Sequence, residues 1–101
     1  MTVSEFRAWK KMAAELPPDH WRELLMRLPN RVRNHAASII WFDLFGGRTV
    51  ANRWPHLDSM VEQYKRTGPA TRAELVDALV RCGYPIEYAS KRCQANLWQE
   101  G

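Results

Sequence analysis

Residues 31–45 limit the possible folds of this chain more than any other segment, because a helix in this segment has apolar side chains on nearly every side. Ile39 and Ile40 lie on one side of the expected helix, while Trp41 and Phe45 lie almost opposite. A helix that is apolar nearly all round must be covered on more than one side. In a chain of 101 residues, either the preceding helices or a second copy of the protein supplies that cover. We expect a homodimer, with an intramolecular core as the alternative.

A short extended segment follows this helix and also favours a dimer. Gly46-Gly47 is expected to end the helix, since glycine readily adopts the left-handed conformation found at the end of many helices. Residues 48–54, RTVANRW, then alternate weakly as in a strand. A lone strand has unpaired backbone groups along both edges, so it needs a partner. Pairing with the same strand of a second molecule meets that need, and a plain extended linker is the alternative.

The remaining segments predict helices. The spacing of apolar residues and the proline, glycine and capping signals place them at about 4–16, from Asp19 to Pro29, across 57–64, from Thr71 to Gly83 and from Pro85 to about 97. The predicted fold is all-α, that is mainly helical, with one short strand. We divide the chain into an N-terminal helical and dimerisation region, residues 1–54, and a helix-turn-helix-like region of three helices, residues 55–101.

The positive charge of the chain is concentrated in residues 27–53. The net charge is +4, yet residues 1–26 and 54–101 each hold equal numbers of basic and acidic side chains. One acid, Asp43, stands in this segment among five arginines: Arg27, Arg31, Arg33, Arg48 and Arg53. Arginine suits bidentate contacts to phosphate or carboxylate, so these residues are candidates for an anion-binding or partner surface. Trp54 adds an expected exposed anchor, and Asp43 is expected to pair with a residue such as Arg48. Solubility and ordinary ion pairs are the alternative explanation of this charge.

The sequence offers little support for catalysis, a metal site, a cofactor or a membrane segment. The three histidines have no Cys or carboxylate at nucleophile-motif spacing, and neither Gly-x-Ser-x-Gly nor a phosphate loop occurs. Cys82 and Cys93 lack zinc-ligand spacing and are expected in the core of the last two helices. No segment approaches the roughly 18 apolar residues that would cross a bilayer. We therefore expect a protein of a reducing cytoplasm that is not an enzyme and holds no metal or cofactor.

The last two helices have the layout of a helix-turn-helix, with a glycine in the short turn between them. In this arrangement the last helix buries Ile86, Ala89 and Cys93 and turns its other side outward. Its N-terminal residues approach base edges, and later ones lie nearer phosphates. The candidate DNA-binding residues are Glu87, Tyr88, Lys91 and Arg92 on the last helix, together with Arg48 and Arg53 beside the strand. A small three-helix module that binds another protein is the alternative.

This order of elements resembles the Mor/C middle-operon transcription activators of Mu-like phages. The residues that carry the resemblance are Gly46-Gly47, TVANRW at 49–54, LDSMVEQYK at 57–65, AEL at 73–75, and Gly83-Tyr84 before IEYASKRC. It extends over about residues 32–93. In that family a dimerisation helix ends in a glycine pair, a short strand follows, and a helix-turn-helix closes the chain. The resemblance implies a homodimer that binds double-stranded DNA in the cytoplasm of a bacterial host cell.

Two functions from different classes are consistent with these patterns. The first is a small dimeric DNA-binding transcription regulator of a phage or mobile element. The second is a phage-encoded protein-binding module that inhibits a host protein through the arginine and tryptophan surface. Residues 67–101, which include the last two helices, carry no net charge. Because affinity for DNA comes largely from phosphate neutralisation, we expect the main phosphate contacts in residues 27–53.

Overall fold

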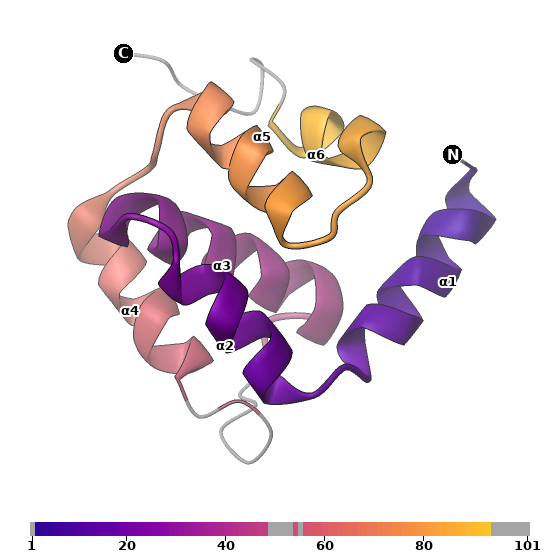
Figure 1. Ribbon diagram of the computed structural model, residues 1–101, viewed down its shortest axis with the longest axis horizontal. Helices are drawn as coiled ribbons and strands as arrows, with labels where there is room; N and C mark the ends of the chain where they lie inside the picture. Colours follow the sequence, from indigo (N-terminus) through magenta and orange to yellow (C-terminus); the bar gives the residue numbers. More distant parts are fainter. Residues whose placement is uncertain (1, 49–53, 55, 94–101) are drawn as a thin grey trace.

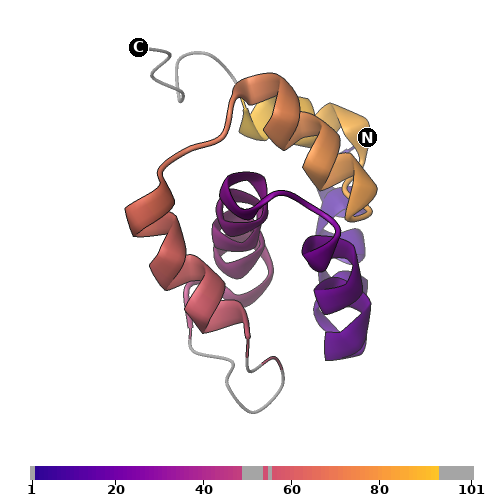
Figure 2. The same ribbon diagram turned by 60° about the vertical axis from the view of Figure 1, so that its left-hand side comes forward.

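α3 (Asn30–Phe45) is the central helix of the structure (Figure 1). The computed structural model describes residues 2–48, 54 and 56–93. The other helices in this part of the chain are α1 (Val3–Ala14), α2 (Pro18–Met26), α4 (Leu57–Thr67), α5 (Arg72–Arg81) and α6 (Ile86–Arg92). α3 contacts α1, α2, α4 and α5, and it contacts α4 most extensively. Figure 2, in which α3 is seen nearly end-on, shows α4, α5 and α2 arranged around it. The described residues therefore form an all-α fold, as predicted.

The apolar sides of α3 are covered from within the chain. Val32, Ala36, Ala37 and Ile40 are all buried, although they lie on different sides of the helix. The intramolecular core, which was the alternative to a homodimer in the sequence-based prediction, is therefore present. Most of α3 needs no second copy of the protein to cover it. Phe42, with 58% of its surface exposed, remains uncovered near the end of the helix.

α3 ends at the glycine pair, as predicted. Gly46 adopts a φ of 62° and Gly47 a φ of 77°, which are left-handed conformations that favour glycine. The amide of Gly46 donates to the carbonyl of Phe42, which closes the last turn. The strand predicted at 48–54 cannot be compared in full, because residues 49–53, including Arg53, lie outside the described residues. Within the described residues there is no strand.

A continuous core joins helices from both predicted regions of the chain. Trp21 of α2 lies at its centre, where its indole N–H donates to the carbonyl of Ala13 at 3.3 Å. The ring of Trp54 stacks near that of Trp21, with 5.9 Å between the ring centres, and also meets Phe45 edge-on. Trp54 is only 2% exposed, so the prediction of an exposed anchor at this position is wrong. Its large apolar ring fills the core between α2 and α3 instead of serving a partner.

A buried polar seam runs along the contact between α3 and α4. The side-chain amide of Asn34 donates to the hydroxyl of Thr67 at 3.3 Å. The amide N–H of Ala70 donates to Nδ1 of His35 at 3.1 Å, and the imidazole stacks on Tyr64. Burial lowers the pKa of His35 to about 4, so the ring is neutral at physiological pH. The first bond ties the end of α4 to α3, and the second ties the segment that follows α4 to the same helix, so both help to position α4 against α3.

Candidate nucleic-acid interface

α5, a short turn and α6 follow one another in the order predicted for the helix-turn-helix. The predicted capping box begins α5: the amide of Glu74 donates to the hydroxyl of Thr71, and the amide of Thr71 donates to the Glu74 carboxylate. Gly83 provides the turn with a φ of 98°. The amide of Tyr84 then donates to the carbonyl of Leu79, which ties the start of the turn back onto α5.

α6 buries one side, as predicted, but not with all of the predicted residues. Ala89 and Cys93 are completely buried, and Cys82 in the turn is buried as well. Ile86 is 65% exposed, so the prediction that it belongs to the core is wrong. The core at this turn is filled by Tyr84, which is 2% exposed. The exposed part of α6 therefore consists of Ile86, Glu87 and Lys91.

Tyr88, which was predicted to face outward, lies half-buried against α1. Its ring stacks on that of Phe6, with 3.4 Å between the ring centres. The neighbouring Trp9 meets Tyr84 edge-on at 4.8 Å. Burial raises the pKa of Tyr88, which keeps its hydroxyl neutral. Residues of α1, which lie outside the family resemblance, thus cover part of the predicted recognition surface.

Arg92, which was predicted near phosphates, is half-buried and forms an ion pair with Asp43. Its guanidinium Nη2 lies 3.1 Å from Oδ1 of Asp43, whose side chain is only 10% exposed. The hydroxyl of Tyr84 donates to the other carboxylate oxygen at 3.1 Å. Burial raises the pKa of Asp43, while Arg92 and the Tyr84 hydrogen bond oppose that rise. The predicted pairing of Asp43 with Arg48 is therefore wrong, because α3 turns this carboxylate toward α6.

This ion pair changes the distribution of charge on the surface. It removes the single acid of residues 27–53, so the arginines there face no acidic residue of their own segment. It also neutralises Arg92, so the remaining charges in the described part of this segment, residues 67–93, balance: Arg72, Arg81 and Lys91 against Glu74, Asp77 and Glu87. The pair therefore leaves the described part of residues 67–101 without net charge, while the arginines described in residues 27–48 have no acid beside them in sequence that is not already paired.

The arginines that were predicted to form one surface lie at opposite ends of α3. Arg27 and Arg31 are exposed near the start of this helix, where Arg33 also lies, half-buried, with its guanidinium donating to the carbonyl of Leu28 at 3.1 Å. Arg48 lies beyond the other end. A helix of 16 residues is about 24 Å long, so these two groups cannot contact one phosphate together.

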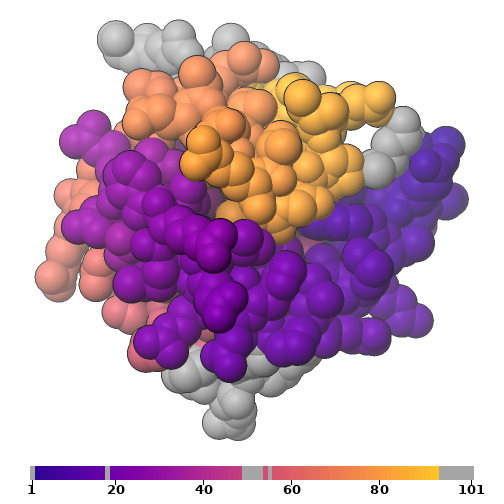
Figure 3. Space-filling view, in the orientation of Figure 1, coloured from indigo at the N-terminus to yellow at the C-terminus, as the bar shows by residue number. Residues whose placement is uncertain are grey.

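Arg31 is also close to the start of α5. Hydrogen bonds with Thr71 lower the pKa of Glu74, and the positive charge of Arg31 adds to that effect. The space-filling view shows the α2–α3 segment and α5 adjoining on one face (Figure 3). The proximity of Arg31 to the helix-turn-helix unit could not be found from the sequence, because it depends on how α5 packs on α3.

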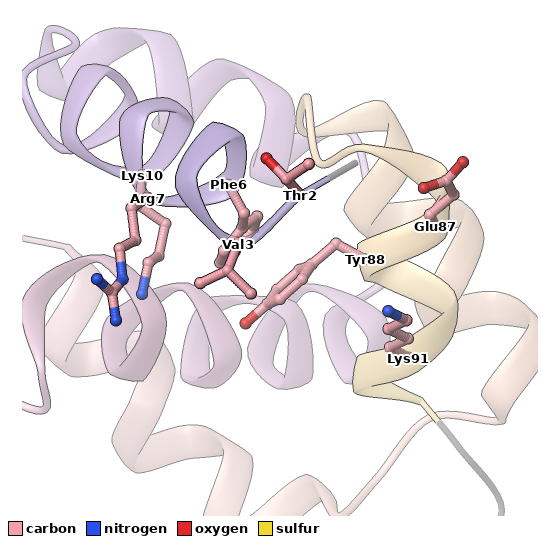
Figure 4. A pocket seen from close by; sticks show the side chains of 8 residues that line it. All are labelled: Thr2, Val3, Phe6, Arg7, Lys10, Glu87, Tyr88 and Lys91. Atoms are coloured by element: carbon pink, nitrogen blue, oxygen red, sulfur yellow. The ribbon is translucent and has the colours of Figure 1, made fainter.

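A hollow of about 280 Å³ lies between α1 and α6. Its apolar part is formed by Val3, Phe6 and Tyr88, and its cationic side chains are Arg7, Lys10 and Lys91. Glu87 and Thr2 complete the lining (Figure 4). Glu87, Tyr88 and Lys91 were predicted from the sequence as DNA-binding candidates. The lining residues of α1 were not predicted, because their position depends on the packing of the first helix against the last.

Neither a metal-binding cluster nor a membrane-spanning helix is found among the residues that the structure describes. No three His, Cys, Asp or Glu side chains within this part of the chain lie close enough together to hold a metal ion. No helix in the same part is long and apolar enough to cross a membrane.

Comparison of the chain with known protein families, with curated proteins and with solved structures finds no match.

Proposed function

We propose that this protein is a DNA-binding transcription regulator of a phage or mobile element and that it acts as a homodimer. The observation that carries the proposal is the arrangement of α5, a glycine turn and α6, with Ile86, Glu87 and Lys91 exposed at the surface of α6. The resemblance of residues 32–93 to the Mor/C activators supports the same function.

The exposed part of α6 has the chemistry to read a major groove. Ile86 and Glu87 occupy the first turn of the helix, the part of a recognition helix that approaches base edges. An apolar side chain contacts the methyl group of thymine, and a carboxylate accepts from the amino group of cytosine. Lys91 lies one turn later, at a position suited to a phosphate. This assignment replaces Tyr88 and Arg92 with Ile86, because the first two are engaged with Phe6 and Asp43.

The arginines near the start of α3 are the candidates for phosphate contacts. In a helix-turn-helix the first helix crosses the DNA backbone, and Arg31 lies beside the first turn of α5. Arg27, also exposed, lies in the preceding turn. Their positive charge supplies the electrostatic affinity that residues 67–101 lack.

The end of α3 is the candidate dimer contact. Phe42 is 58% exposed there, and Trp41 lies beside it with its indole N–H donating to the carbonyl of Arg48 at 2.8 Å. Exposed aromatic and arginine side chains are the commonest anchors of protein interfaces. This patch retains the location that the sequence predicted for the dimer, although the rest of α3 is covered within the chain.

The test is a titration of random-sequence duplex DNA at several salt concentrations. Arg31→Ala should weaken binding to all sequences alike and reduce the slope of log K against log salt by about one unit, since one phosphate contact is lost. Ile86→Ala should leave that slope unchanged and alter which sequences are preferred. Arg81→Ala is the matched control, because Arg81 is exposed on α5 but is already paired with Asp77. Equal losses from Arg31→Ala and Arg81→Ala would contradict the phosphate assignment.

The dimer is tested separately by light scattering at micromolar concentration. Phe42→Ser should convert a dimer to a monomer of about 11.8 kDa. Met26→Ser, at another exposed apolar residue, should not change the mass. A monomeric unmodified protein would contradict the dimer but not DNA binding.

The second candidate is a protein-binding module that inhibits a host protein. It is favoured by the lack of a net positive charge in residues 67–101, because a DNA-binding surface normally carries surplus cations. A host protein recovered in stoichiometric amount after nuclease treatment, and lost with Phe42→Ser but not with Met26→Ser, would favour this candidate. Recovery of DNA alone would favour the regulator.

A further inference from the structure

We propose that the hollow between α1 and α6 binds a small organic anion with a flat apolar body and one anionic group. This inference does not depend on DNA binding, since it concerns a separate ligand. The hollow measures about 280 Å³, just below the range of about 300–1,000 Å³ that is typical of small-molecule sites. This volume suits a ligand of one or two fused rings.

The apolar part of the hollow accounts for the body of the ligand. Val3 is 70% exposed and Tyr88 is half-buried, so these two side chains supply the accessible apolar surface, while the buried ring of Phe6 stacks on Tyr88 and forms the floor beneath them. In Figure 4 these three side chains occupy the middle of the hollow. Apolar and aromatic surface left uncovered at the surface of a small protein favours an apolar ligand.

The polar groups account for the negative charge of the ligand. Arg7 and Lys10 lie side by side on one side of Val3, and the hydroxyl of Tyr88 points toward that side (Figure 4). Lys91 lies on the other side, on α6. Against these three cations the lining contains one acid, Glu87, which lies at the end of the hollow away from Arg7 and Lys10. The buried acid nearby, Asp43, is paired with Arg92, so the charge of the hollow favours an anion.

The probe is 2-naphthoate, which combines two fused rings with a carboxylate, and its uncharged counterpart is 2-naphthylmethanol. Titration calorimetry and ligand-observed NMR should show one site with millimolar or tighter affinity for 2-naphthoate. The alcohol has the same ring body without the charge, so it should bind more weakly by at least about threefold. Binding of both compounds with equal affinity, or no binding of 2-naphthoate, would overturn the proposal.

Two pairs of variants locate the site. Lys10→Ala should weaken 2-naphthoate binding about twofold to fivefold, the usual effect of one exposed ion pair. Lys11→Ala, at the next residue of α1, removes the same charge outside the hollow and should have no effect. Val3→Glu places a negative charge within the hollow and should weaken binding on the order of tenfold. Ser4→Glu makes the same charge change at an exposed residue that does not line the hollow.

These variants remain folded, because Val3 and Ser4 are both exposed and a carboxylate in the first turn of a helix is favourable. Equal loss of binding from Val3→Glu and Ser4→Glu, or from Lys10→Ala and Lys11→Ala, would show that 2-naphthoate binds elsewhere and would overturn the assignment.

Discussion

The contact between α3 and α4 excludes water, whereas the contact between α1 and α6 leaves part of its surface accessible to water. The α3–α4 contact is the most extensive in the structure, and Leu57, Met60 and Val61 of α4 are buried in it. The side-chain N–H of Asn34 donates to Thr67, and Nδ1 of His35 accepts from the amide of Ala70 just after α4. The α1–α6 contact depends on the stacking of Phe6 on Tyr88 and leaves an open hollow beside it.

This difference separates stability from binding. A closed contact gains free energy from every apolar group removed from water, so substitutions in it affect the whole fold. An open contact keeps cationic and apolar side chains accessible, and these are the groups that a ligand or DNA can use. We therefore expect the α3–α4 contact to determine stability and the α1–α6 contact to determine binding.

The largest expected effect comes from truncating the α3–α4 core. Leu57→Ala should lower the free energy of unfolding by about 2–5 kcal/mol, as for other buried leucines, because it removes apolar contacts and leaves a cavity. Ile86→Ala, at an exposed apolar residue of α6, should change it by less than about 0.5 kcal/mol. Urea denaturation followed by circular dichroism measures both values. Similar losses from the two variants would break the comparison.

A smaller effect is expected from the protonation of His35. Its Nδ1 accepts the amide hydrogen of Ala70, so the folded protein favours the neutral ring and the pKa falls from 6.5 to about 4. The unfolded chain therefore binds more protons between these pH values, and stability should decrease as the pH falls from about 6.5 to about 4. The loss is at most about 3 kcal/mol.

Denaturation across this pH range tests the effect. A His35→Gln variant should lose most of the pH dependence, whereas His20→Gln, at an exposed residue, should retain it. An unchanged pH dependence in His35→Gln would mean that the α3–α4 seam does not control acid stability.

The smallest expected effect concerns the α1–α6 contact. Phe6→Leu keeps an apolar side chain but loses the stacking on Tyr88, which should lower the free energy of unfolding by about 0.5–1.5 kcal/mol. Hydrogen exchange should become faster in α1 and remain unchanged in α3, because α1 opens locally. Equal acceleration in α1 and α3 would show that the two contacts form one cooperative unit.

The helices were predictable because their signals are local. The capping hydrogen bonds of Thr2 with Glu5 and of Thr71 with Glu74 are present, and α1 and α5 begin at the following residue. Gly46 ends α3 in the predicted left-handed conformation. Each of these signals involves residues within one turn of one another, so a pattern in the sequence is sufficient to find them.

The candidate site was predictable only in part. The glycine turn and the exposure of Glu87 and Lys91 follow from helical spacing. The exposure of Ile86 does not, because it depends on Tyr84 filling the core at the turn. The half-burial of Tyr88 likewise depends on α1, which reaches α6 from the other end of the chain.

The sequence by itself determined that the chain is helical, where α1 and α5 begin, that α3 ends at the glycine pair, and that the surplus positive charge lies in residues 27–53. Only the tertiary structure decided that Asp43 faces α6, where it receives a hydrogen bond from Tyr84, 41 residues away, and pairs with Arg92. It also decided that Trp54 is buried and that α1 covers part of α6. The physical reason is that local backbone bonding sets the helices, whereas the direction in which a side chain is buried depends on distant helices that compete to cover the same apolar surface.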